Sequence, residues 1–167
     1  MKLESGKPHP RRWGARVLAV GAALAAAIAV SLAAAAPAQA ATPTCNGTGA
    51  YYRNGGDTAT FVATYTANGS ETWRCSMRYG LGTTGKFSYA VLQLQDSLNL
   101  CYGKVIGGRI GADGEFGTQT KNALVKVQRA LGITADGVYG PQTAAAMQHW
   151  SWSYTPYGLY YVCLRLP

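Results

Sequence analysis

Residues 58–66 (TATFVATYT) are rich in β-branched and aromatic side chains, and their alternating pattern predicts a strand. Residues 67–70 (ANGS) predict a turn, because Asn and Gly accept positive φ at low cost. Residues 71–77 (ETWRCSM) predict the returning strand. A hairpin alone is marginal in water, so we expect it to pack against another part of the chain or to be held by a disulfide.

From Ser88 the apolar period changes from two to about 3.6, which predicts helices. Ser88 is a suitable N-cap for a first helix that reaches Cys101. A second helix is expected to begin at Thr118 and to stop at Gly132. A third is expected to begin with Pro141 at its first position and to end near Trp150. The apolar positions of the first two helices are Tyr89, Val91, Leu94, Leu98 and Leu100, then Leu124, Val127 and Leu131.

A repeat connects these helices. Residues 112–124 (ADGEFGTQTKNAL) and 135–147 (ADGVYGPQTAAAM) match, 23 residues apart. In each copy Asp-Gly predicts a tight turn, the aromatic residue points inward, and the next Gly lets the chain pass closely into a helix. The connection between the first helix and the first copy is ten residues longer than the connection between the second helix and the second copy. The additional residues lie in 101–109. The structural turn residues are Asp113, Gly114, Gly117, Asp136, Gly137 and Gly140.

Two copies are too few for a solenoid but can share a middle helix. The sequence therefore predicts a mainly α fold, a compact three-helix domain over residues 87–150. Residues 41–86 form a β-hairpin or extended N-terminal flank, and residues 151–167 form an aromatic C-terminal tail. We expect a monomer.

Residues 1–40 have the order of a secretory signal: a basic start, an apolar run and the small-x-small sequence Ala38-Gln39-Ala40. A retained membrane anchor is the alternative, because the apolar run is long enough to span a bilayer. Cleavage after Ala40 gives a secreted, extracellular chain with no membrane segment.

Charge and cysteine content narrow the class of protein. Residues 41–167 hold ten Lys and Arg and six Asp and Glu, a net charge of +4 against +8 for the full chain. No basic cluster remains, which argues against nucleic acid. Four cysteines in an exported chain predict two disulfides. The alternatives are a metal site or a catalytic thiol, but residues 41–167 contain no C-x-x-C pair and one histidine, His149, which argues against zinc. No cofactor is indicated.

Sequence alone allows three disulfide pairings, and chain geometry favours one of them. If residues 75–85 run back beside the first helix, Cys75 can reach Cys101 at its far end. Cys45 then pairs with Cys163. The competing pattern, Cys45 with Cys75 and Cys101 with Cys163, would staple the hairpin and the tail separately.

The ordered motifs resemble the peptidoglycan-binding domain of bacterial cell-wall hydrolases. The series V-x-x-L-Q-x-x-L, D-G-x-F-G-x-x-T-x-x-A-L, V-Q and D-G-V-x-G-x-x-T runs through residues 88–150. One departure is that Gly82-Thr83-Thr84-Gly85 ends six residues before Val91, where the family has a G-x-x-G turn three residues before it. The cysteine-bearing flanks look like those of small exported stand-alone versions.

The resemblance implies a non-catalytic module that binds peptidoglycan at the cell wall, through the peptide stem and the adjoining sugar. The irregular segment 101–109 lies beside the first turn. Its Lys104 and Arg109 are candidates to meet stem carboxylates, and Tyr102 is a candidate to pack on the ligand. The alternative is that both cations are solvated loop charges.

An enzyme is not expected, because the residues outside the motif hold no catalytic set. A Ser-His-Asp triad would need His149, which we interpret as a helix-end residue. A carboxylate pair could come from Asp57, Glu71, Asp96 and Glu115. An accessory part of a hydrolase system is a further alternative.

The aromatic tail offers a different hypothesis. In residues 149–161 (HWSWSYTPYGLYY), Trp150, Trp152 and Tyr154 alternate and would share one side of an extended segment. Such a surface suits carbohydrate or a protein partner. The favoured alternative is that the strip folds over the hairpin and completes a core with Tyr51, Tyr52, Phe61 and Tyr65.

Overall fold

The structure is a computed structural model that describes residues 41–82 and 85–167. The predicted signal and its alternative, a retained anchor, lie outside the described residues. Across the described ranges, no helix has the length and apolar character needed to cross a membrane. The elements in chain order are β1 (Gly47–Arg53), the short 3-10 turn η1 (Asn54–Gly56), β2 (Thr58–Ala67), β3 (Ser70–Thr72), α1 (Lys86–Ile106), α2 (Thr118–Ala130), α3 (Pro141–Ala146), β4 (Gln148–Thr155) and β5 (Gly158–Arg165).

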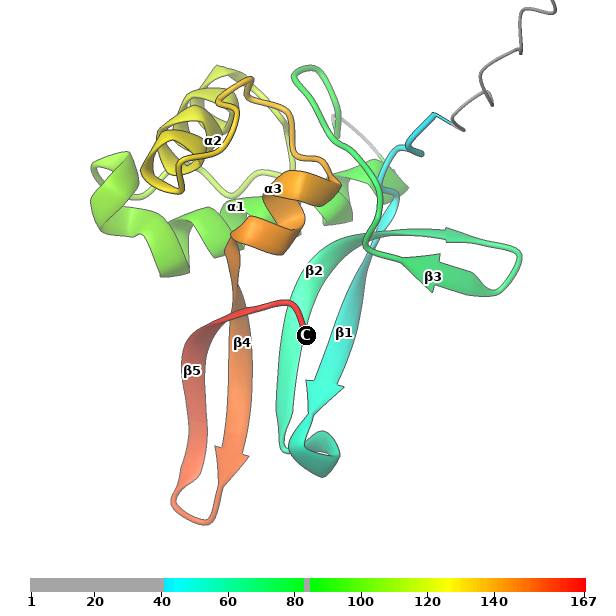
Figure 1. Cartoon of the computed structure of the whole chain (residues 1–167), viewed down its shortest axis with the longest axis vertical. Helices are drawn as coiled ribbons and strands as arrows, with labels where there is room; N and C mark the ends of the chain where they lie inside the picture. The colour runs from blue at the N-terminus through cyan, green and yellow to red at the C-terminus, as the bar shows by residue number, and fades with distance from the viewer. Residues whose placement is uncertain (1–40, 83–84) are drawn as a thin grey trace, which may run out of the picture. The chain divides into compact units, whose positions relative to one another are not determined.

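The predicted mainly α fold is wrong. The described residues form three helices and a five-stranded antiparallel sheet in the order β1-β2-β4-β5, with β3 also paired to β2 (Figure 1). The molecule is therefore not a three-helix bundle. The helical pattern correctly predicted the presence of α1, α2 and α3. The residues before α1 and after α3 form the strands.

The N-terminal strands differ from the predicted hairpin in one respect. Asn68 (φ 51°) and Gly69 (φ 75°) form the expected turn after β2. The returning strand stops at Thr72, because the chain bends at Trp73 toward the helices. The longer partner of β2 is β1, which the sequence analysis missed because two glycines, Gly47 and Gly49, weaken its strand signal.

α1 extends further than predicted. It begins at Lys86 rather than Ser88 and continues through most of the segment expected to be irregular. It stops at Gly107 (φ 85°), where the N–H groups of Gly107 and Gly108 both donate to the Gly103 carbonyl. Two residues assigned to its apolar stripe, Tyr89 and Leu100, are 67% and 51% exposed, so the buried face is narrower than the pattern suggests.

The third helix is shorter than predicted. α3 ends at Ala146, Met147 is extended (ψ 152°), and Trp150 lies in β4. β4 pairs with β2 as well as with β5, and these cross-strand bonds override the local helical pattern. His149 is accordingly a buried strand residue and not the end of a helix.

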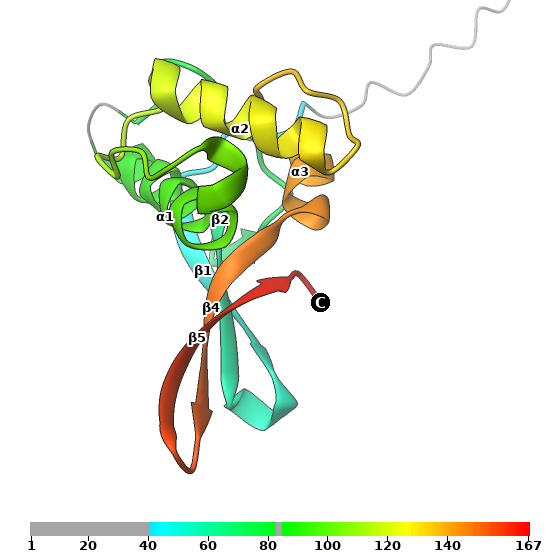
Figure 2. The ribbon, with the colours of Figure 1, turned by 90° about the vertical axis from the view of Figure 1, so that its left-hand side faces the viewer.

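α1 packs against β1, β2 and β4 and also against α2, and these contacts together form the core (Figures 1 and 2). Trp150 stacks on Phe61 with ring centroids 4.4 Å apart, so the tail does return to the hairpin strands. Tyr51 and Tyr65 pack on the core, but Tyr52 is 62% exposed and takes no part in it. The largest fully buried side chains are Tyr139, Phe116, Met77, Leu94, Leu98, Leu124 and Met147.

The predicted disulfides, Cys75 with Cys101 and Cys45 with Cys163, are wrong. The bonds join Cys45 to Cys75 and Cys101 to Cys163. Residues 75–77 pair with two other segments of the chain, which the predicted course beside the first helix did not include. Ser76 pairs with Thr44 and Met77 pairs with Tyr139, which holds Cys75 next to Cys45.

Candidate ligand-binding groove

The first Asp-Gly turn is held by a buried glutamine of α1. The Gln95 amide nitrogen donates to Asp113 Oδ1 (2.8 Å), the Glu115 carbonyl (3.0 Å) and Thr120 Oγ1 (3.0 Å). Its carbonyl oxygen accepts from the Gly114 N–H (2.8 Å). Asp113 Oδ1 also accepts from the Glu115 N–H (2.9 Å), which closes the turn. The turn is thus fixed to α1 on one side and to the start of α2 on the other.

The second turn has the same set of bonds. The Gln128 amide nitrogen donates to Asp136 Oδ1 (2.9 Å), the Val138 carbonyl (3.0 Å) and Thr143 Oγ1 (3.2 Å). Its oxygen accepts from the Gly137 N–H (2.9 Å), and the Val138 N–H donates to Asp136 (2.8 Å). The Asp, the Gly that follows it and the Thr of each copy are therefore members of a repeated hydrogen-bond network.

The two glutamines had no predicted structural role. The available signal was that the two glutamines follow the same apolar spacing: Gln95 comes directly after Val91-x-x-Leu94, and Gln128 directly after Leu124-x-x-Val127. A buried amide at such a position needs partners for its donors and its acceptor. The Asp-Gly turns that follow were the polar groups within reach.

The glycines of the repeat have two different roles. Gly114 (φ 77°) and Gly137 (φ 71°) have left-handed backbone, and an added Cβ would collide with Ser88 or Lys121. Gly117 (φ −84°) and Gly140 (φ −130°) precede α2 and α3 in extended backbone, with nothing within 4 Å of an added Cβ. The expected close approach at these last two positions is therefore absent from the structure.

A groove of about 290 Å³ lies where the loop after α1 meets one side of α2. Asn99 fixes this loop, since its side chain donates to the Ile110 carbonyl (3.1 Å) and accepts from the Ile110 N–H (2.8 Å). Lys126 of α2 donates to the Ile106 carbonyl (2.7 Å) at the end of α1. The lining residues are Ile106, Gly107, Gly108, Arg109, Ile110, Gln119, Asn122, Ala123 and Lys126.

The three predicted ligand residues lie in different surroundings. Arg109 is exposed and lines the groove. Lys104 is exposed in the last turn of α1 and is not among the lining residues. Tyr102 is 7% exposed, its hydroxyl oxygen accepts from the Gln148 N–H (2.6 Å), and burial raises the pKa of its phenol. The phenol of Tyr102 thus joins α1 to the start of β4.

Three polar groove residues were missed: Gln119, Asn122 and Lys126. Their spacing of three and four residues along α2 places them on one helix face, and this was the signal that could have identified them. The groove therefore offers amide donors and acceptors together with the cations of Lys126 and Arg109. Such groups suit a ligand that carries carboxylates and amides.

Two carboxylates near the groove have shifted pKa values. Hydrogen bonds from the Gln95 side chain and from the Glu115 backbone lower the pKa of Asp113. Burial raises the pKa of Asp96, and the charge of Arg109 partly opposes that shift. Among the described residues, no group of His, Cys, Asp and Glu side chains could hold a metal ion.

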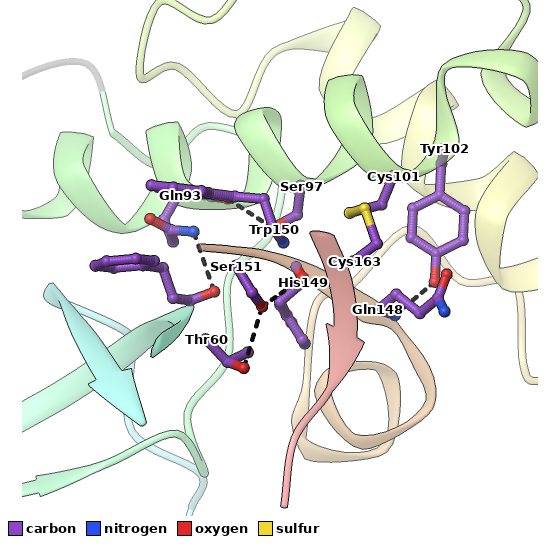
Figure 3. The surroundings of a disulfide bond; sticks show 11 residues. Thr60, Gln93, Ser97, Cys101, Tyr102, Gln148, His149, Trp150, Ser151 and Cys163 are labelled. Carbon is purple, nitrogen blue, oxygen red and sulfur yellow. Dashed lines mark hydrogen bonds between the residues drawn. A yellow bond between two sulfur atoms is a disulfide. The ribbon is translucent and has the colours of Figure 1, made fainter. Parts of the chain in front are cut away.

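His149 is enclosed beside the second disulfide (Figure 3). It is 1% exposed, and its Nε2 lies 2.9 Å from the Ala144 carbonyl, which makes Nε2 the donor. Burial lowers the pKa of its imidazole. The neighbouring Ser151 hydroxyl donates to Thr60 Oγ1 and to the His149 carbonyl rather than to the imidazole. Both side chains are closed off from solvent, so this pair has no access to a substrate.

The helical part of the chain, which contains the groove, is similar to a known protein family. Residues 87–147 match the family model described as "Putative peptidoglycan binding domain". Residues 87–147 therefore resemble a peptidoglycan-binding domain. The match covers α1, α2, α3 and both Asp-Gly turns, so the domain contains the groove.

Curated relatives share short segments with this chain. A "Probable N-acetylmuramoyl-L-alanine amidase" of Bacillus licheniformis is 49% identical over 39 residues, 23% of this chain and 11% of the relative. The N-acetylmuramoyl-L-alanine amidase CwlM of Mycobacterium tuberculosis is 51% identical over 35 residues, 21% of this chain and 9% of the relative. The matched segments thus span about a tenth of the length of these relatives.

A solved structure is also similar in part. It is a peptidoglycan-binding protein from Clostridioides difficile in complex with glutamine hydroxamate, 28% identical, with a TM-score of 0.38. The similarity covers 57% of this chain and 53% of that protein.

Proposed function

We propose that residues 41–167 form an exported, non-catalytic module that binds the peptidoglycan of the bacterial cell wall. The observation that carries the proposal is the groove between the loop after α1 and α2, inside the peptidoglycan-binding domain. The wall's peptide stem combines carboxylates and amides, which match Arg109, Lys126, Gln119 and Asn122. The adjoining sugar would lie at the mouth of the groove.

The absence of catalysis is part of the proposal. The two curated relatives are amidases, but those enzymes are about ten times longer than the segments they share with this chain. The one histidine of residues 41–167 is enclosed, and Asp113 and Asp136 accept hydrogen bonds within their turns. The module would therefore contribute wall attachment, as a monomer, outside the cell.

Co-sedimentation with purified peptidoglycan tests this function. Walls stripped of anionic polymers are mixed with residues 41–167 at moderate salt and pelleted. We expect the protein in the pellet and no soluble muropeptides in the supernatant. A protein that stays in the supernatant contradicts wall binding, and release of muropeptides contradicts the non-catalytic assignment.

A further inference from the structure

Aromatic side chains line up across the sheet on one of its faces. Tyr52 of β1 is paired with Ala59 of β2, Ala59 with Trp152 of β4, and Trp152 with Tyr161 of β5. Directly paired residues of antiparallel strands lie on the same face. Four adjacent strands thus contribute one row of side chains, and three of the four are aromatic.

The same face continues along β4 and β5. Tyr154 is paired with Leu159 two residues beyond the row, toward the end of the hairpin. In the other direction Trp150 lies 6.4 Å from Tyr161, between ring centroids. We call Tyr52, Trp152, Tyr154, Leu159 and Tyr161 the aromatic face.

The aromatic face lies beyond the end of the sheet that α1 covers. The disulfide from Cys101 to Cys163 fixes α1 over one end of β5. Figures 1 and 2 show the tips of the β1–β2 and β4–β5 hairpins extending away from the three helices. Most of these side chains accordingly stay in solvent: Tyr52 is 62% exposed, Tyr154 64%, Leu159 52% and Tyr161 71%. An exposed cluster of this kind marks a binding surface.

The chemistry of the aromatic face favours a sugar chain. It holds no charged residue, and four of its five side chains are Tyr or Trp, which combine a flat apolar ring with a polar tip. Sugar rings present apolar C–H faces and hydroxyls at their edges, so both parts of these side chains find a partner. A polyanion or an acidic peptide would find no cation in this row.

The spacing of the row points to the same ligand. Neighbouring strands lie about 4.8 Å apart, so Tyr52 and Trp152 are separated by about 10 Å and Trp152 and Tyr161 by about 5 Å. Successive rings of an extended β-1,4-linked glycan repeat at a closely similar interval. A glycan that crosses the strands can therefore place consecutive sugar rings over the row.

We propose that the aromatic face binds the glycan strand of the wall, as a second site apart from the groove for the peptide stem. This inference rests on the proposed function. The helical part of the molecule then holds the stem, and the sheet holds the sugar backbone.

The test uses the full residues 41–167 with two ligands, hexa-N-acetylchitohexaose and peptidoglycan glycan strands freed of their stems. Trp152 is half-buried on the aromatic face, so its emission should change when either ligand binds. Tyr161→Ala and Tyr52→Ala should weaken binding by about fivefold or more. Both side chains are more than half exposed, so both variants should fold, which circular dichroism checks.

Tyr160→Ala is the matched control, because Tyr160 is 49% exposed on the same strand but points to the opposite face. It should bind the glycans as the wild type does. Equal losses in Tyr160→Ala and Tyr161→Ala would overturn the proposal, as would glycan binding unchanged in Tyr52→Ala and Tyr161→Ala. Sedimentation velocity gives a further outcome: a dimer that Tyr161→Ala dissociates would make the face an interface between two copies.

The two proposals can fail separately. If the protein pellets with intact walls but does not bind stem-free glycan, the proposed function stands and the glycan site is contradicted. Protein that binds neither walls nor glycan contradicts both.

Discussion

At the scale of single residues, the repeat is explained by hydrogen bonds rather than by composition. Gln95 and Gln128 each satisfy one Asp-Gly turn, a backbone carbonyl and a threonine hydroxyl. Both amides are buried, so each missing partner would leave a polar group without compensation. The Asp, Gly and Thr shared by both copies take part in this network, whereas Glu115 and Val138 contribute only backbone groups to it and differ between the copies.

The two kinds of glycine in the repeat should respond differently to alanine. Gly114→Ala forces a side chain into left-handed backbone and against Ser88, and should lower the free energy of unfolding by about 2–4 kcal/mol. Gly117→Ala adds its methyl to open space in extended backbone and should cost less than about 1 kcal/mol. Urea unfolding followed by tryptophan emission measures both. Equal costs would contradict the assigned roles.

His149 should make stability depend on pH. Burial lowers the pKa of the folded imidazole, so below about pH 6.5 the unfolded chain binds a proton that the native state does not. Stability should then fall as the pH falls from 6.5 toward the lowered pKa, by at most about 1.4 kcal/mol per pH unit. Thermal unfolding between pH 7 and 5 measures this slope.

His149→Gln is the control for that slope, because it removes the titrating group and retains a donor for the Ala144 carbonyl. It should flatten the decline between pH 7 and 5. Asp96 acts in the opposite direction, since its raised pKa favours the folded state as the pH falls through that value. A decline of the same steepness in His149→Gln would show that another group is responsible.

At the scale of elements, the sequence predicted those helices and strands whose formation depends on interactions between nearby residues. The starts of α2 at Thr118 and of α3 at Pro141 follow from glycine and proline signals, and β2 follows from its β-branched residues. β1 and β4 were missed, because both depend on pairing with β2 rather than on their own propensity.

The groove could be predicted only in part for the same reason. Arg109 follows from its place beside the first turn, but the contribution of α2 depends on how the loop after α1 folds onto it. The pairing of the cysteines likewise depends on long-range contacts, between Thr44 and Ser76 and between α1 and β5. The spacing of residues in the sequence predicts neither the position of the loop on α2 nor the pairing of the cysteines.

The disulfide between α1 and β5 should stabilise the fold strongly. It closes 62 residues, so replacing Cys101 and Cys163 together by Ala should lower the free energy of unfolding by about 4 kcal/mol through the unfolded chain. Replacing Cys45 and Cys75, which close 30 residues but are fully buried, adds a packing loss to a similar entropic effect. Urea unfolding under non-reducing conditions compares the two; a change below about 1 kcal/mol in the first variant would contradict this role.

At the scale of the whole described unit, residues 41–167 present two surfaces of different chemistry. The groove on the helical side offers Arg109, Lys126 and side-chain amides, and the aromatic face offers uncharged rings. A polymer made of peptide stems on a glycan backbone has both kinds of group. Attachment through two weak sites also strengthens binding to an insoluble wall more than either site would alone.

The most direct measurement is the binding isotherm of the protein on purified peptidoglycan, compared between Arg109→Ala and Arg129→Ala. The two variants change the net charge equally, but Arg109 lines the groove and Arg129 lies in the last turn of α2 and is not among the lining residues. We expect Arg109→Ala to weaken binding by about tenfold, the loss of one charge-assisted contact, and Arg129→Ala to change it by less than about twofold. Equal weakening in the two variants would mean that net charge alone holds the protein on the wall, and would contradict recognition through the groove.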